Sequence, residues 1–238
     1  MAGTKGLMQP IKNIVQLRQF LAERLPNMRV LPAHMGPKRT SCWPTGLPQI
    51  DDLLEGGLPT AALTEIVNAK TGSGGALLIF ALLRQTCESR QWLALIDGQD
   101  CFDPSSVDRG TLSRLLWARC GNANQALKAA DLLARDGNVP LIILDLQLNP
   151  PAQLQKIPST TWYRFQRLLE STSSALLVLT PRPMIGCAQA RIALRSQFNS
   201  IALDQTKAEL LANLKVESLR RPYSRTEETG NAAVAQVG

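Results

Sequence analysis

The chain has 238 residues, of which 45% are apolar, and its formal net charge at neutral pH is +7. A chain of this length and composition can bury a sizeable core, which excludes a wholly disordered protein. Its apolar runs are much shorter than the roughly 20 residues that span a bilayer, and no apolar signal segment stands at the N-terminus. We therefore expect a cytoplasmic protein with no membrane partner.

The positive charge is concentrated towards the two ends. Residues 1–40 contain seven basic residues and one acidic residue, whereas residues 41–181 contain eleven basic and thirteen acidic residues. Residues 182–225 again contain an excess, with eight basic and three acidic residues. Basic ends of this kind suit contact with nucleic acid or an acidic protein, and equally a solvated surface.

Cysteine and histidine usage argues against a metal centre. The five cysteines are widely spaced, and the chain has one histidine. No pair of them has the spacing of a metal-ligand motif, and a single histidine disfavours most histidine-based acid/base catalysis. We expect no metal site.

The first 44 residues are predicted to form an N-terminal helix and a linker. Between Ile11 and Leu25 apolar residues recur at helical spacing, which predicts an amphipathic helix. Four prolines follow before residue 45 and prevent a continuous helix or strand, so this stretch is predicted to be a basic, Pro-rich linker. The helix could pack on its own core, which we favour, or support self-association or partner binding.

From residue 45 short apolar runs alternate with helical stretches, the pattern of a parallel sheet covered by helices. It predicts strands at 62–67, 92–96, 141–145 and 175–180, and helices at 76–87, 124–136 and 161–171. Antiparallel edge strands are expected at 200–203 and 214–219. This pattern predicts one α/β domain over residues 45–225, followed by a disordered tail over residues 226–238.

A glycine-rich loop joins the strand at 62–67 to the helix at 76–87. Glycines at the start of a helix let backbone N–H groups approach a phosphate, and here they are Gly72, Gly74 and Gly75. The phosphate-binding pattern GxxxxGK[ST] is degenerate, because its defining positions hold Asn68, Ser73, Gly74 and Gly75. Lys70 comes too early to replace the motif lysine. We expect a turn without nucleotide binding, with residual binding as the alternative.

Three stretches resemble the RecA family in order and spacing. They are TGLPQIDDLLEGGLPTAALTEI at residues 45–66, ALIDGQDCFDP at residues 94–104, and the stretch over residues 108–145, which ends at a Walker-B-like aspartate. The resemblance covers residues 45–180. It implies a RecA-like three-layer α/β core with a mainly parallel sheet.

The catalytic positions of this resemblance are altered. RecA-like ATPases use a glutamate after the second strand as the base, and the matching position holds Gln99, whose amide cannot accept a proton at neutral pH. Asp97 and the Walker-B-like Asp145 are present, although an aspartate at a strand end is also a common turn residue. Because lysine, hydroxyl and base are all absent, we expect no catalytic residue, no ATP or magnesium cofactor and no enzyme activity.

Three features resemble a narrower group, the ImuA-type or SulA-like proteins of bacterial inducible-mutagenesis cassettes. They are the degenerate loop, the Leu-Leu-Trp step at residues 115–117 and the stretch LVLTPRPMIGCAQARIALR. This resemblance implies a non-catalytic accessory or scaffold role in SOS-type DNA damage tolerance and translesion synthesis. It implies a Y-family polymerase homologue and an error-prone replicative polymerase as partners, with RecA as a further candidate.

Basic residues in the last third are candidates for binding DNA or a partner protein. In RecA, loops after the Walker-B strand and the next strand face DNA, and the matching residues here are 146–160 and 181–197. Arg191 and Arg195 would share one side of a helix. No base-reading motif is present, so DNA binding would be independent of sequence and weakened by salt. The full candidate set, in which Tyr223 offers a stacking surface, is Arg182, Arg191, Arg195, Arg220, Arg221, Tyr223 and Arg225.

Two other functions stay open. An active DNA-dependent ATPase or recombinase mediator would use Lys70 and Asp145 in an altered nucleotide site. A cell-division inhibitor acting on a protein target would cause filamentation on overexpression without DNA damage.

Overall fold

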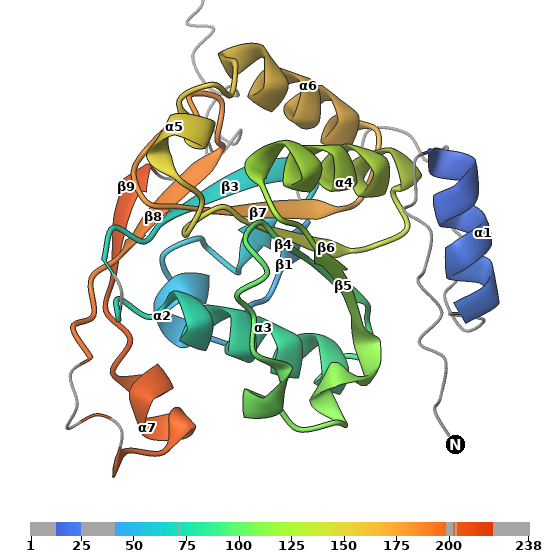
Figure 1. Ribbon diagram of the computed structural model, residues 1–238. Helices are drawn as coiled ribbons and strands as arrows, with labels where there is room; N and C mark the ends of the chain where they lie inside the picture. The colour runs from blue at the N-terminus through green and yellow to red at the C-terminus, as the bar shows by residue number, and fades with distance from the viewer. Residues whose placement is uncertain (1–12, 25–40, 71, 199–201, 203, 221–238) are drawn as a thin grey trace, which may run out of the picture.

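The computed structural model describes residues 13–24, 41–70, 72–198, 202 and 204–220. Its centre is a seven-stranded sheet with the order β5-β4-β6-β7-β3-β8-β9 (Figure 1). The first six strands in this order are parallel, and β9 pairs antiparallel with β8. The strands are β3 (Ala62–Val67), β4 (Leu93–Asp97), β5 (Leu115–Arg119), β6 (Leu141–Asp145), β7 (Ala175–Thr180), β8 (Ala190–Leu194) and β9 (Val216–Arg220).

Helices cover both faces of the sheet. α3 (Gly75–Glu88) lies on one face, whereas α4 (Ala123–Asp136) and α6 (Ser159–Glu170) lie on the other (Figure 1). This is the predicted RecA-like three-layer core. The shorter elements are β1 (Cys42–Trp43), α2 (Pro48–Asp51), β2 (Leu58–Pro59), α5 (Pro151–Leu154), α7 (Lys207–Ala212) and two 3₁₀ helices, η1 (Pro104–Ser106) and η2 (Thr111–Arg114).

Successive residues of each central strand enter two separate apolar layers. In β4, Leu93 and Leu95 pack in the layer that contains α3, whereas Ala94 and Ile96 pack in the layer that contains α4 and α6. A parallel strand that is buried on both faces has a continuous apolar sequence. For this reason β3, β6 and β7 have the bounds predicted for them.

Capping residues set the ends of the helices. The Asn122 side chain accepts a hydrogen bond from Gln125 N at 3.0 Å at the start of α4, and Gly137 ends this helix with φ 70°. At α7, the side chains of Thr206 and Glu209 form a capping box.

The predicted N-terminal helix is α1 (Ile14–Arg24), and it packs on α4 of the same chain. Leu17 and Leu21 are buried in the α4 layer, and Arg18 Nε lies 3.0 Å from the buried carboxylate of Asp136. The linker that follows lies largely outside the described residues. In the part of the chain that the structure describes, no helix is long and apolar enough to cross a membrane.

Two expectations for the C-terminal third need correction. Residues 190–194 form the strand β8, so Arg191 and Arg195 do not share one side of a helix. Most of the strand expected at 200–203 lies outside the described residues, and Ala202 has 3₁₀ conformation. The predicted strand at 214–219 is β9, antiparallel as expected.

Candidate functional site

Most of the predicted nucleotide-site residues meet where the parallel strands end, which we call the carboxyl edge of the sheet. β3 leads into the loop over residues 68–75, and β4 and β6 end in Asp97 and Asp145, which are paired in register. Ligands of open α/β sheets bind at this edge. The edge is therefore the candidate site.

Protein side chains fill the start of the glycine loop. Asn68 is 2% exposed, and its Nδ2 donates a hydrogen bond to Oε1 of Gln147 from the loop after β6. A Cβ atom added to Gly75 would collide with Asn68 Nδ2 and lie 2.6 Å from Gln147 Oε1. Gly75 occupies the position of the magnesium-binding hydroxyl, so a side chain there would have to displace the ends of the Asn68 and Gln147 side chains.

The position of the motif lysine is also blocked. Gly74 has φ 108°, and a Cβ atom there would collide with Cδ1 of Leu214. Ser73 donates from Oγ to the Lys70 carbonyl at 2.5 Å and from its backbone N at 3.2 Å. The Lys70 side chain is exposed. The loop is thus closed by its own hydrogen bonds, with its one lysine at the surface.

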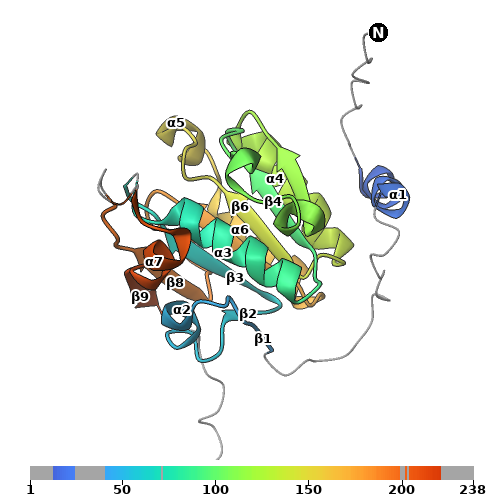
Figure 2. The ribbon, with the colours of Figure 1, turned by 90° about the horizontal axis from the view of Figure 1, so that it is seen from below.

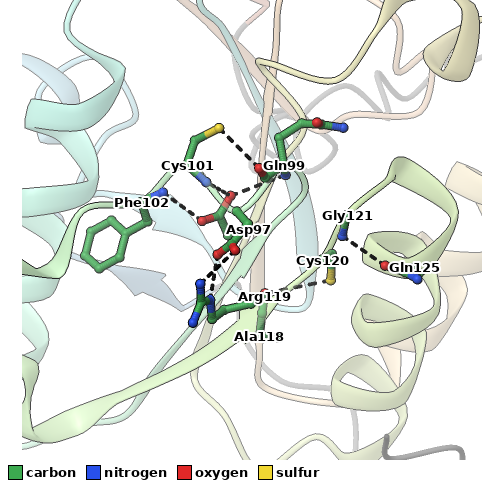
Figure 3. A network of polar contacts seen from close by, with 10 residues as sticks. Asp97, Gln99, Cys101, Phe102, Ala118, Arg119, Cys120, Gly121 and Gln125 are labelled. Carbon is green, nitrogen blue, oxygen red and sulfur yellow. Dashed lines mark hydrogen bonds and ion pairs between the residues drawn. The ribbon is translucent and has the colours of Figure 1, made fainter.

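Asp97 holds the turn after β4. Its Oδ1 accepts hydrogen bonds from Cys101 N at 3.0 Å and Gln99 N at 3.3 Å, and its Oδ2 accepts from Phe102 N at 2.8 Å (Figure 3). The Gln99 side chain points away from this carboxylate (Figure 3). Asp97 therefore satisfies backbone donors, and the position of the ATPase base carries an amide turned elsewhere.

A surface cluster that sequence reasoning missed adjoins this turn. Arg119 makes two hydrogen bonds to Asp100, at 2.6 and 2.7 Å, and the hydrogen bonding of this guanidinium holds the pKa of the Asp100 carboxyl below its usual value. The guanidinium carbon also lies 4.9 Å from the ring centroid of Trp117, which contacts Phe102 edge to face. The available signal was the i, i+2 spacing of Trp117 and Arg119, which puts both on one face of β5.

Asp145 has a less complete set of partners. Within the described part of the chain, its side-chain Oδ1 accepts one hydrogen bond, from Gln147 N at 3.0 Å. Burial raises the pKa of Asp145 to about 6; the Gln147 N–H opposes this rise, and the charge of Asp97 adds to it. Nearby, Asn149 Nδ2 donates to the Gly98 carbonyl at 3.0 Å and ties the ends of β4 and β6 together. Gln147 and Asn149 were also missed, since no local pattern marks them.

Arg191 belongs to a buried ion pair, which corrects its assignment to an exposed basic surface. Its Nε lies 2.5 Å from Glu65 Oε2, and its Nη2 donates to the Ile185 carbonyl at 2.7 Å. Glu65 is fully buried in β3 and also accepts from Thr180 Oγ1 and Met184 N. The sequence prediction failed because the neutralising partner lies in a distant strand.

The other predicted basic residues that the structure describes do not form one surface. Arg182 and Arg195 are exposed near the carboxyl edge, and Arg195 Nε lies 2.6 Å from the Glu217 carboxylate. Arg220 is the last residue of β9 and pairs with Arg191 near the start of β8, away from the carboxyl edge. Its side chain donates a hydrogen bond to the Gly186 carbonyl at 2.7 Å. The remaining candidates lie outside the described residues: Arg221, Tyr223 and Arg225.

Comparison with known proteins shows partial homology. No family model matches the chain. It is 31% identical to the protein RecA of Methylococcus capsulatus over 117 residues, which cover 47% of this chain and 33% of that relative. It is 31% identical to the protein RecA of Acinetobacter baumannii over 104 residues, which cover 42% of this chain and 30% of that relative. The chain thus spans about a third of the length of these curated relatives, and the homology, together with the three-layer fold, supports its membership of the RecA superfamily.

Proposed function

We propose that this chain is a RecA-like accessory protein of DNA damage tolerance that does not hydrolyse ATP. It acts as a scaffold that supports translesion synthesis, and its partners are a Y-family polymerase homologue and an error-prone replicative polymerase, with RecA as a further candidate. The observation that carries the non-catalytic part is the filled glycine loop, in which Leu214, Asn68 and Gln147 occupy the space of the motif lysine and hydroxyl.

The remaining groups do not compensate for these losses. ATP hydrolysis in this superfamily needs a cation on the outer phosphates, a magnesium-binding hydroxyl and a base. The corresponding positions here hold Gly74, Gly75 and Gln99. The Asp97 carboxylate accepts hydrogen bonds from three backbone N–H groups, and Lys70 lies at the surface. The residues at these positions do not supply the groups that phosphate transfer needs.

Direct contact with DNA is a secondary part of the proposal. Arg182 and Arg195 are exposed near the carboxyl edge and could contact phosphates without reading sequence, although Glu217 offsets the charge of Arg195. Such binding would weaken steeply with salt. The accessory role does not depend on it.

A complementation experiment tests the accessory role. We expect deletion of the gene to reduce the frequency of damage-induced mutations to the uninduced level, and the wild-type chain and the Lys70→Ala chain to restore it equally. An unchanged mutation frequency in the deletion strain would refute the accessory role. Failure of Lys70→Ala to complement, with normal protein levels, would favour an active ATPase instead.

A further inference from the structure

We propose that the chain's own C-terminal segment binds the glycine loop. This contact holds the carboxyl edge in one conformation whether or not nucleotide is present. We define this segment, the α7 clamp, as Phe198 together with residues 206–215. The inference rests on the non-catalytic part of the proposed function and adds to it the device that keeps the loop closed. α7 lies beside α3 on the same face of the sheet (Figure 2).

Direct contacts join the clamp to the loop. Phe198 N donates to the Gly72 carbonyl at 3.2 Å. The Leu214 side chain occupies the space next to Gly74, and the ring of Phe198 lies 3.7 Å from the position of a Cβ atom there. Leu214 is only 3% exposed. Apolar groups therefore cover the first turn of α3, where a phosphate would otherwise meet the positive end of the helix.

Anchors on three other elements hold α7 in place. Gln49 Nε2 of α2 donates to the carbonyls of Leu211 and Ala212 at 3.3 and 3.1 Å. Lys207 Nζ lies 4.3 Å from the ring centroid of Phe80 on α3 and donates to the carbonyl of Ser106 in η1. These contacts join residues far apart in the sequence, so α7 is part of the fold rather than a loosely attached helix.

The backbone on either side of Leu214 is fixed as well. Lys215 N donates to Ser196 Oγ at 2.8 Å, and Arg195 N donates to the Lys215 carbonyl at 2.8 Å. Leu214 N donates to the Leu211 carbonyl at 3.2 Å. These hydrogen bonds fix the backbone on both sides of Leu214, which favours the position of its side chain next to Gly74.

The clamp explains why glycine is required at position 74. A residue with φ 108° is strained if it carries a side chain, and Leu214 leaves no room for one. A phosphate-binding loop uses glycine so that a ligand can approach the backbone. In this chain the approaching group is a leucine of the same polypeptide.

A double-mutant cycle on the full chain tests the contact. The variants are Gly74→Ala, Leu214→Ala and the pair, and urea unfolding gives their folding equilibrium constants. We expect Gly74→Ala to reduce this constant about tenfold less in the Leu214→Ala background, because truncation of Leu214 relieves the collision. Gly186→Ala and Leu219→Ala are matched controls, since, apart from the two chain neighbours, none of the residues that the structure describes lies within 4 Å of a Cβ atom at Gly186, and Leu219 is 39% exposed.

Amide exchange of the wild-type chain gives a test that needs no variant. We expect the Phe198 amide to exchange slowly and at the same rate with and without MgATP. Additive effects in the cycle, or exchange of Phe198 as fast as an unstructured amide, would overturn the clamp and leave the non-catalytic function standing. DNA-stimulated ATP hydrolysis by the wild type, with coupling intact, would instead overturn the non-catalytic function.

Discussion

The loop after β3 and the turn after β4 reach the same edge of the sheet, yet they differ in how far they depart from the RecA pattern. The turn retains Asp97, and its carboxylate accepts hydrogen bonds from three backbone N–H groups. The loop has neither the motif lysine nor the hydroxyl, and Leu214, Asn68 and Gln147 fill their space. At Asp97 the fold uses a motif residue to hold a turn, whereas in the glycine loop packed side chains fill the space that ligand-binding side chains would need.

The largest loss of stability is expected on removal of Arg191, whose charge is paired with a buried carboxylate. Arg191→Ala leaves the carboxylate of Glu65 buried and unpaired, which should lower the free energy of unfolding by about 4 kcal/mol in a urea titration. Arg195→Ala is the matched control, because its ion pair with Glu217 is half exposed and should contribute less than about 1 kcal/mol. Equal losses for the two variants would contradict the assignment of Arg191 to the core.

Removal of the Asp97 carboxylate should have the next largest effect. Asp97→Ala leaves three backbone donors without their acceptor, so we expect a loss of about 3 kcal/mol in the free energy of unfolding. Asp97→Asn keeps one acceptor oxygen and should lose less. If Asp97→Ala unfolds at the wild-type urea concentration, the carboxylate has no role in the turn and the comparison fails.

Replacement of Asp145 should raise the free energy of unfolding rather than lower it. Because the pKa of this carboxyl is raised to about 6 in the folded chain, folding is favoured when it is protonated, and that contribution is lost as the pH rises from about 4 through 6. Asp145→Asn should therefore stabilise the chain by about 1–3 kcal/mol at pH 7.5 and leave its stability unchanged near pH 3.5. Thermal unfolding across this pH range checks the prediction, and a variant that is less stable than the wild type at pH 7.5 would contradict it.

The smallest effect is expected at Lys70. Its side chain is exposed, so Lys70→Ala should change the free energy of unfolding by less than about 0.5 kcal/mol. The thermal midpoint should also stay the same with and without MgATP. A midpoint that rises with MgATP in the wild type but not in this variant would show that the loop binds nucleotide.

Much of the core could be predicted from the sequence because its signals are local. The apolar runs of β3, β6 and β7 marked buried parallel strands, and the degenerate positions of the glycine loop were visible in the residue types. β8 was missed because Arg191 suggested a solvent-exposed segment, while the carboxylate that neutralises it is 126 residues away. The filling of the loop by Gln147 and Leu214 could not be predicted either, since it depends on contacts between distant segments.

The most direct test of the central claim is an equilibrium titration of the full chain with MgATP, followed by a measurement of phosphate release with single-stranded DNA. The closed glycine loop predicts no saturable binding and no DNA-stimulated release above that of a protein-free control. Micromolar binding that is lost in Lys70→Ala, together with DNA-stimulated release, would show that the chain is an active ATPase and contradict the account.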